Sequence, residues 1–211
     1  KEKINEMEIA ILGCYLPLHS LKNVVKKLTN YESKNILFND LISMQVIEPL
    51  KEKKLINSIK SLSEISDKVS LQVKDQYEKN PYPRWRYTYS QIASPFLTKL
   101  EHQIRPNKIK MENRFDKLKI LVAGCGTGQH ICIVKDYLNS NILAIDLSLP
   151  SLAYAKRKTD ELNLDNIEYL HADILELHKL KKKFDVIECA GVLHHMEKPT
   201  RGLKILLNLL E

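Results

Sequence analysis

Residues 120–130 read ILVAGCGTGQH, and the rest of the chain is organised around them. The first four are apolar and predict a buried strand. An amphipathic run at 131–138 then continues at helical spacing. A strand, a glycine turn and a helix bring backbone N–H groups and the positive end of a helix against a ligand. The turn holds glycine at three alternate positions, where a Cβ would block the turn or the ligand: Gly124, Gly126 and Gly128.

Length and composition fit a globular protein of 211 residues with a net charge of +7. No apolar run reaches about 18 residues, so we expect no membrane span. The opening KEKINEMEIA lacks the features of a signal peptide, and we expect a cytoplasmic protein. The four cysteines lack metal-ligand spacing, which predicts reduced thiols and no metal site. The basic run at 179–183 could attract an acidic partner, but a solvated face explains it better and nucleic-acid binding is not expected.

The pattern divides the chain into three parts. Residues 1–76 predict an all-helical region, and 77–114 a linker with a helix that leads into the second domain, 115–211. Residues 77–85 read YEKNPYPRW, and we call them the aromatic–proline segment. Its two prolines stop a helix and stiffen an extended path. Two interpretations stay open: a linker held across the next domain by Tyr82 and Trp85, or a lip over a ligand pocket with Arg84 or Tyr77 facing substrate.

Strands and helices alternate from residue 119 onward. Such alternation predicts a parallel sheet with right-handed crossovers, of Rossmann-like α/β class, whose ligand lies beyond the carboxyl ends of the strands. The expected strands are 119–123, 141–145, 167–170 and 184–188, and the helical segments between them 128–138, 149–162 and 174–180.

Charged residues fall where these strands end. Asp146 ends the second strand, 22 residues after Gly124, where a carboxylate can accept both hydroxyls of a ribose. Helix capping is the other explanation for Asp146, but Ser148 is better placed for it. Asp173 follows the third strand and could accept from an adenine amine while the N–H of Ile174 donates to the ring. Glu188, at the end of the fourth strand, is a further candidate contact.

In this order the motifs resemble those of the class I S-adenosylmethionine-dependent methyltransferases. They are GCGTG at 124–128, Asp146, ADI at 172–174 and GVLHH at 191–195. QVIEPL at 45–50 and QYEKNPYPRW at 76–85 look like one bacterial branch of that family. Its members often carry tetratricopeptide repeats, and it includes rickettsial lysine methyltransferases that act on outer-membrane proteins.

The resemblance implies S-adenosylmethionine as the cofactor. Its methionine end would lie on the glycine turn, including Cys125, its ribose on Asp146, and its adenine on Asp173 and Ile174. Val122 departs from the family, which usually has an acidic residue there. A lysine acceptor must be neutral, so it needs a general base or a proton path. The adjacent histidines 194 and 195 are candidates or structural residues, and no catalytic residue is assigned.

The family's sheet has seven strands, and this sequence provides four, so we expect a truncated fragment. The apolar fourth strand would then be an edge, which favours self-association. One alternative function is a non-catalytic fragment that keeps cofactor binding. Another is a NAD-dependent oxidoreductase, although a dinucleotide fingerprint places its third glycine where Gln129 stands.

Overall fold

The computed structural model describes residues 4–88, 93–108, 117–134, 137 and 139–211. The chain forms two compact units, Lys1–Leu55 and Ile56–Glu211. The structure therefore groups the residues after Leu55 with the sheet, whereas the sequence assigned 1–76 to one helical region. The predicted boundary at 114 lies outside the described residues. The division into three parts stays a prediction.

The first unit is helical, as the sequence predicts. Asparagine side chains start two of its helices, because Asn5 accepts from the N–H of Glu8 and Asn35 from that of Leu37. Its core contains Leu18, Leu28, Phe38, Ile42 and Val46. The elements are α1 (Glu6–Tyr15), η1 (Leu18–Ser20), α2 (Lys22–Leu28), α3 (Ile36–Ile42), the π-helical η2 (Ser43–Ile47) and α4 (Glu48–Ile56), which runs into the second unit.

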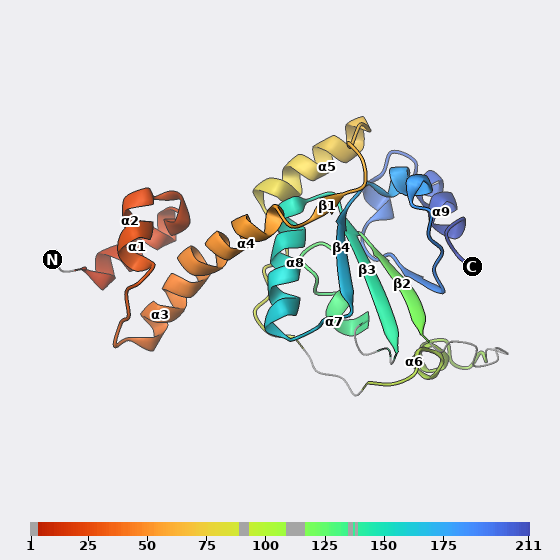
Figure 1. Ribbon diagram of the computed structural model, residues 1–211, viewed down its shortest axis with the longest axis horizontal. Coiled ribbons are helices and arrows are strands. Elements are labelled where there is room, and N and C mark those ends of the chain that lie inside the picture. Colours follow the sequence, from red (N-terminus) through yellow and green to blue (C-terminus); the bar gives the residue numbers. More distant parts are fainter. Residues whose placement is uncertain (1–3, 89–92, 109–116, 135–136, 138) are drawn as a thin grey trace. The chain divides into compact units, whose positions relative to one another are not determined.

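The second unit is built on a five-stranded parallel sheet in the order β1-β4-β3-β2-β5 (Figure 1). This confirms the predicted Rossmann-like α/β fold. Successive residues of β2 are buried on opposite faces, as a sheet covered on both sides requires. The strands are β1 (Lys60–Ser61), β2 (Leu118–Ala123), β3 (Ser140–Asp146), β4 (Ile167–His171) and β5 (Val186–Glu188).

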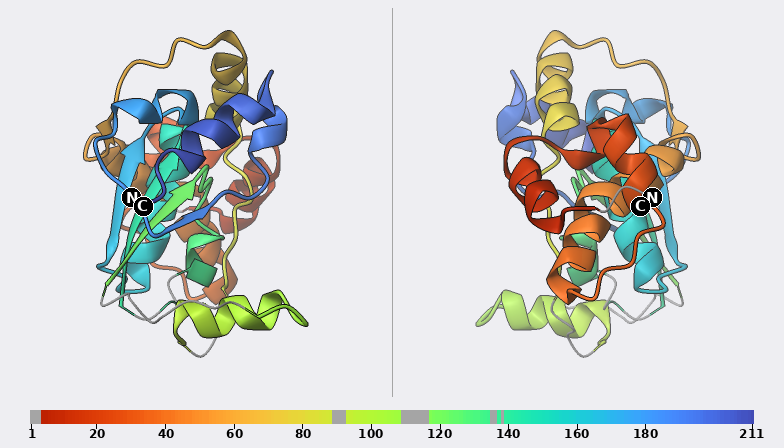
Figure 2. Two further views of the ribbon diagram at one scale, coloured as in Figure 1. Left: turned by 90° about the vertical axis from the view of Figure 1, so that its right-hand side faces the viewer. Right: turned by 90° about the vertical axis from the view of Figure 1, so that its left-hand side faces the viewer.

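Helices cover both faces of this sheet (Figures 1 and 2). Leu121 and Leu143 pack with Leu177 and Leu206 on one face, and α8 contacts β3 and β4 from the other. The helical elements are α5 (Lys68–Lys79), α6 (Phe96–Gln103), α7 (Ile131–Val134), α8 (Leu149–Glu161), η3 (Ile174–Lys179), η4 (Leu193–His195) and α9 (Pro199–Leu207). Among the described residues, no helix is both long enough and apolar enough to cross a membrane.

Two details differ from the sequence prediction. The predicted sheet has four strands, but β1 adds a fifth beside β4, pairing Lys60 with Leu170. The fourth predicted strand starts at 184, whereas β5 starts at Val186 and Phe184 forms an isolated bridge with Leu210. Among the described strands β5 lies at one edge of the sheet. Self-association through this edge stays a prediction.

Candidate functional site

A cavity of about 380 Å³ lies at the carboxyl ends of the strands. α5 and the aromatic–proline segment contribute to its wall through Ser70, Tyr77 and Tyr82. Six of the predicted site residues line it: Gly124, Cys125, Gly126, Asp146, Asp173 and Ile174. These six residues, up to 50 positions apart in the sequence, therefore meet where a parallel sheet binds its ligands.

The glycine turn explains why one predicted residue, Gly128, does not line the cavity. Gly128 has φ +83°, and a Cβ there would lie 2.7 Å from the Cβ of Ala155 on α8. This glycine is therefore required for close packing of the turn against the helix. A Cβ at Gly126 would have the Tyr82 carbonyl oxygen as its nearest neighbour, at 3.7 Å, so this position faces the cavity wall.

Asp146 connects the end of β3 to the glycine turn. Its Oδ2 accepts from the N–H of Gly126 at 2.8 Å, and its Oδ1 accepts from the N–H of Ser148 at 2.9 Å. Burial raises the pKa of Asp146, and these two hydrogen bonds offset part of the rise. Ser148 is the N-cap of α8 and accepts from the N–H of Ser151, so Asp146 does not serve as that cap.

Asp173 has an oxygen that suits a ligand donor. The residue is 2% exposed, and its Oδ1 accepts from the N–H of Leu175 at 2.9 Å. Its Oδ2 is buried and finds no hydrogen-bond partner among the described residues, and the same is true of Ser151 Oγ. Both residues line the cavity. Because an unpaired buried polar group costs about 1–3 kcal/mol, two such atoms facing one cavity fit the polar edge of a nucleoside.

Glu188 lies beside the glycine turn but does not line the cavity. Its Oε1 accepts from the Tyr137 hydroxyl at 3.0 Å, and its Oε2 lies 3.4 Å from His130 Nε2. The nearby His130 imidazole lowers the pKa of Glu188, which favours the ionised carboxylate. His130 itself lines the cavity.

The aromatic–proline segment lies over the glycine turn. Trp85 is 7% exposed, and its Nε1 donates to the carbonyl of Thr127 at 2.8 Å. The Thr127 hydroxyl donates to the Pro83 carbonyl at 2.5 Å, and that of Tyr154 donates to the Trp85 carbonyl. Trp85 attaches the segment to the domain, as the linker interpretation expects. Tyr77 and Tyr82 line the cavity, whereas Arg84 is not among its lining residues. A contact of the segment with substrate stays a prediction.

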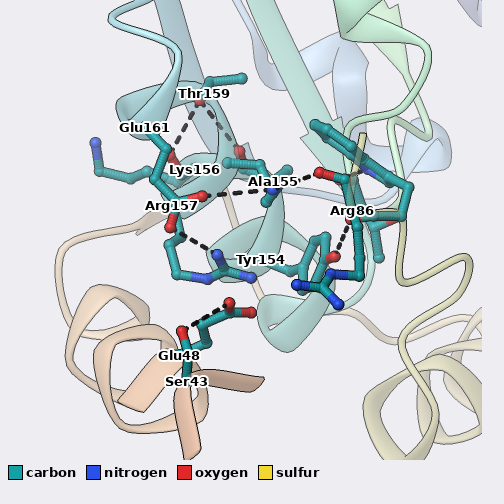
Figure 3. Close-up of polar contacts among 12 residues, drawn as sticks. Ser43, Glu48, Arg86, Tyr154, Ala155, Lys156, Arg157, Thr159 and Glu161 are labelled. Carbon is teal, nitrogen blue, oxygen red and sulfur yellow. Dashed lines mark hydrogen bonds and ion pairs between the residues drawn. The ribbon is translucent and has the colours of Figure 1, made fainter. Parts of the chain in front are cut away.

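The face of α8 that carries Tyr154 anchors this attachment (Figure 3). Tyr154 points toward the segment that carries Arg86, and Lys158 Nζ donates to the Arg86 carbonyl at 3.1 Å. On the same helix Arg157 pairs with Glu161 at 2.8 Å. These contacts fix the helix that also supplies Ser151 to the cavity.

Of the two adjacent histidines, one lines the cavity and the other does not. His195 lines the cavity, and its Nε2 lies 3.4 Å from the Tyr77 hydroxyl. The rings of His194 and His195 are 4.1 Å apart. Burial lowers the pKa of His195, and the neighbouring His194 adds to the effect. This shift favours the neutral imidazole.

Part of the chain is similar to known proteins. Residues 120–211 match the family model described as "Methyltransferase domain". An uncharacterized protein of Synechococcus sp. is 33% identical over an alignment 159 residues long, which covers 66% of this chain and 34% of that protein. The chain thus spans about a third of the length of this relative.

Two solved structures are similar to parts of this chain. PKMT2 from Rickettsia typhi, in complex with AdoHcy, is 29% identical over 45% of this chain and 19% of that chain, with a TM-score of 0.40. Magnesium protoporphyrin IX methyltransferase from Synechocystis, with bound SAM, is 18% identical over 71% of this chain and 75% of that chain, with a TM-score of 0.49. The first of these structures holds AdoHcy and the second holds SAM.

Sequence reasoning missed polar residues of the cavity, among them Ser151 and His130. Ser151 follows the N-cap Ser148 by one helical turn, which places it on the cavity side of α8. His130 directly follows the glycine turn. In both cases the available signal was proximity to a predicted contact, since a lone serine or histidine carries no motif.

Proposed function

We propose that the cavity binds S-adenosylmethionine and that the protein transfers its methyl group to an acceptor. The observation that carries this proposal is the meeting of the glycine turn, Asp146 and Asp173 at one cavity of a methyltransferase domain. Gly124, Cys125 and Gly126 would hold the methionine end. Asp146 would accept the ribose hydroxyls, and Asp173 with the N–H of Ile174 would hold the adenine.

When bound, S-adenosylmethionine supplies an electrophilic methyl group on a sulfonium. The residues of the chain then need only orient the reactants and exclude water, because in-line displacement requires no covalent help from the protein. Tyr82 and Pro83 of the aromatic–proline segment line the cavity beside the glycine turn. They are suited to shield the reacting atoms from water.

For the acceptor we propose a protein lysine. The support is the resemblance of residues 76–85 to the bacterial branch that contains lysine methyltransferases. A lysine amine must lose its proton before it attacks, and His195 lines the cavity with a lowered pKa that favours its neutral form. With the Tyr77 hydroxyl at 3.4 Å, His195 offers a path for that proton.

The chain should bind S-adenosylhomocysteine at least tenfold more tightly than NAD. The position after the glycine turn that a dinucleotide fold gives to glycine is Gln129. Isothermal titration calorimetry with both ligands measures the difference. Tighter binding of NAD would overturn the methyltransferase proposal and favour an oxidoreductase.

A transfer assay separates an enzyme from a fragment that only binds. The chain is incubated with S-adenosylmethionine that carries a tritiated methyl group and with a lysine-rich protein, and the modified amino acids are identified after hydrolysis. We expect label on lysine nitrogen. Cofactor binding without label on any acceptor would support the non-catalytic alternative.

A further inference from the structure

We propose that His130 and Glu188 together recognise the amino-acid end of the cofactor. The inference rests on the proposed function and extends it. The cofactor carries an ammonium and a carboxylate at this end, and an adjacent carboxylate and imidazole are the complementary pair of groups.

The order of the strands separates this pair from the residues that we propose bind the nucleoside. Asp173 follows β4 and Asp146 ends β3, so the groups proposed for the nucleoside lie on one side. The glycine turn follows β2, and Glu188 ends β5. Because parallel strands lie about 4.8 Å apart, β4 and β5 are about 14 Å apart across three spacings. A ligand whose adenine lies near β4 therefore extends its other end toward β5.

β2 carries no acidic side chain near its end, so a carboxylate for the ligand ammonium must come from another strand. Residues 120–123 are all apolar, and Val122 is buried. In the sheet, Val122 is the register partner of Glu188. Paired residues of neighbouring strands project to the same face, so Glu188 brings a carboxylate to the side of the sheet on which Val122 carries none.

The contacts of Glu188 hold it in the ionised form beside the cavity. His130 Nε2 lies 3.4 Å from Oε2, and the Tyr137 hydroxyl donates to Oε1 at 3.0 Å. His130 lines the cavity, and its buried Nε2 makes no hydrogen bond of good geometry among the described residues. A buried polar atom without a well-formed hydrogen bond is suited to bind a ligand. His130 and the N–H groups of the turn can donate to the ligand carboxylate, and Glu188 can accept from its ammonium.

Two ligands that differ only at this end provide the test. S-adenosylhomocysteine carries the amino and carboxylate groups, whereas 5′-methylthioadenosine has the same nucleoside and sulfur without them. Glu188→Gln and His130→Ala should each weaken binding of S-adenosylhomocysteine by about tenfold or more, as loss of a charged hydrogen bond requires. Both variants should bind 5′-methylthioadenosine within twofold of the wild-type affinity.

Asp173→Asn is the matched control, because its amide would face the adenine amine and should weaken both ligands by the same factor. Circular dichroism and thermal unfolding establish that each variant is folded, and Glu188→Gln retains an acceptor for Tyr137. Equal loss for both ligands in the Glu188 and His130 variants, or no loss for either, would overturn the inference. If the wild-type chain binds neither ligand, the proposed function itself fails.

Discussion

Replacing Trp85 by Ala should lower the free energy of unfolding of the second unit by about 3–5 kcal/mol, the range for truncating a large buried aromatic residue. The indole ring is 7% exposed and meets the ring of Tyr154 edge-on, with centroids 6.3 Å apart. Its Nε1 donates to the Thr127 carbonyl at 2.8 Å, and that buried acceptor would lose its partner. Urea denaturation followed by circular dichroism measures the change.

Two matched variants separate the contributions of Trp85. Trp85→Phe keeps a ring against Tyr154 but loses the donor, and should cost about 1–3 kcal/mol. Tyr82→Ala removes a side chain that is 73% exposed, so it should leave stability unchanged while it weakens binding of S-adenosylhomocysteine. If Trp85→Ala unfolds within 1 kcal/mol of the wild type, the segment is not held to the glycine turn as described.

The sequence could not decide between the two interpretations of the aromatic–proline segment. Prolines and aromatics predict a stiff extended path, but the partners of that path lie far along the chain. Trp85 contacts Thr127, 42 residues later, and Thr127 carries no motif that points back to it. Neighbouring residues of the segment then serve different purposes, since Tyr82 lines the cavity and Trp85 is buried.

The core of the fold could be predicted because its signals are local. The apolar run of β2, the glycine turn and the carboxylate at the end of β3 are each read from a few adjacent residues. β1 escaped prediction because Lys60 and Ser61 are two exposed polar residues with no alternating pattern. The position of Glu188 beside Val122 depends on strand order and register, which no local pattern contains.

Ionisation of Asp146 should oppose folding in the absence of ligand. Burial raises its pKa in the folded state above the unfolded value. Its contribution to stability is therefore present at low pH and is lost as the pH rises through the folded pKa. Asp146→Ala should lack this contribution, so the stability difference between wild type and variant should shrink as the pH rises from the acid range to neutrality. Thermal unfolding of both proteins across this range measures it.

Asp146→Ala should weaken binding of S-adenosylhomocysteine by about 1.5–3 kcal/mol, or roughly 10–150-fold. The carboxylate would accept the two ribose hydroxyls, and it also fixes the glycine turn through the N–H of Gly126 at 2.8 Å. Losing both functions places the expected effect toward the upper end of the range. Asp173→Ala should cost less, because backbone contacts to the adenine would remain.

Ser148→Ala is the control for the structural part of this effect. Ser148 caps α8 next to Asp146, so its loss should cost about 1 kcal/mol of stability and leave affinity nearly unchanged. Calorimetric titration of the three folded variants, Asp146→Ala, Asp173→Ala and Ser148→Ala, gives the comparison. If folded Asp146→Ala binds S-adenosylhomocysteine with wild-type affinity, then Asp146 does not hold the ribose, and its contact with Gly126 serves the turn alone.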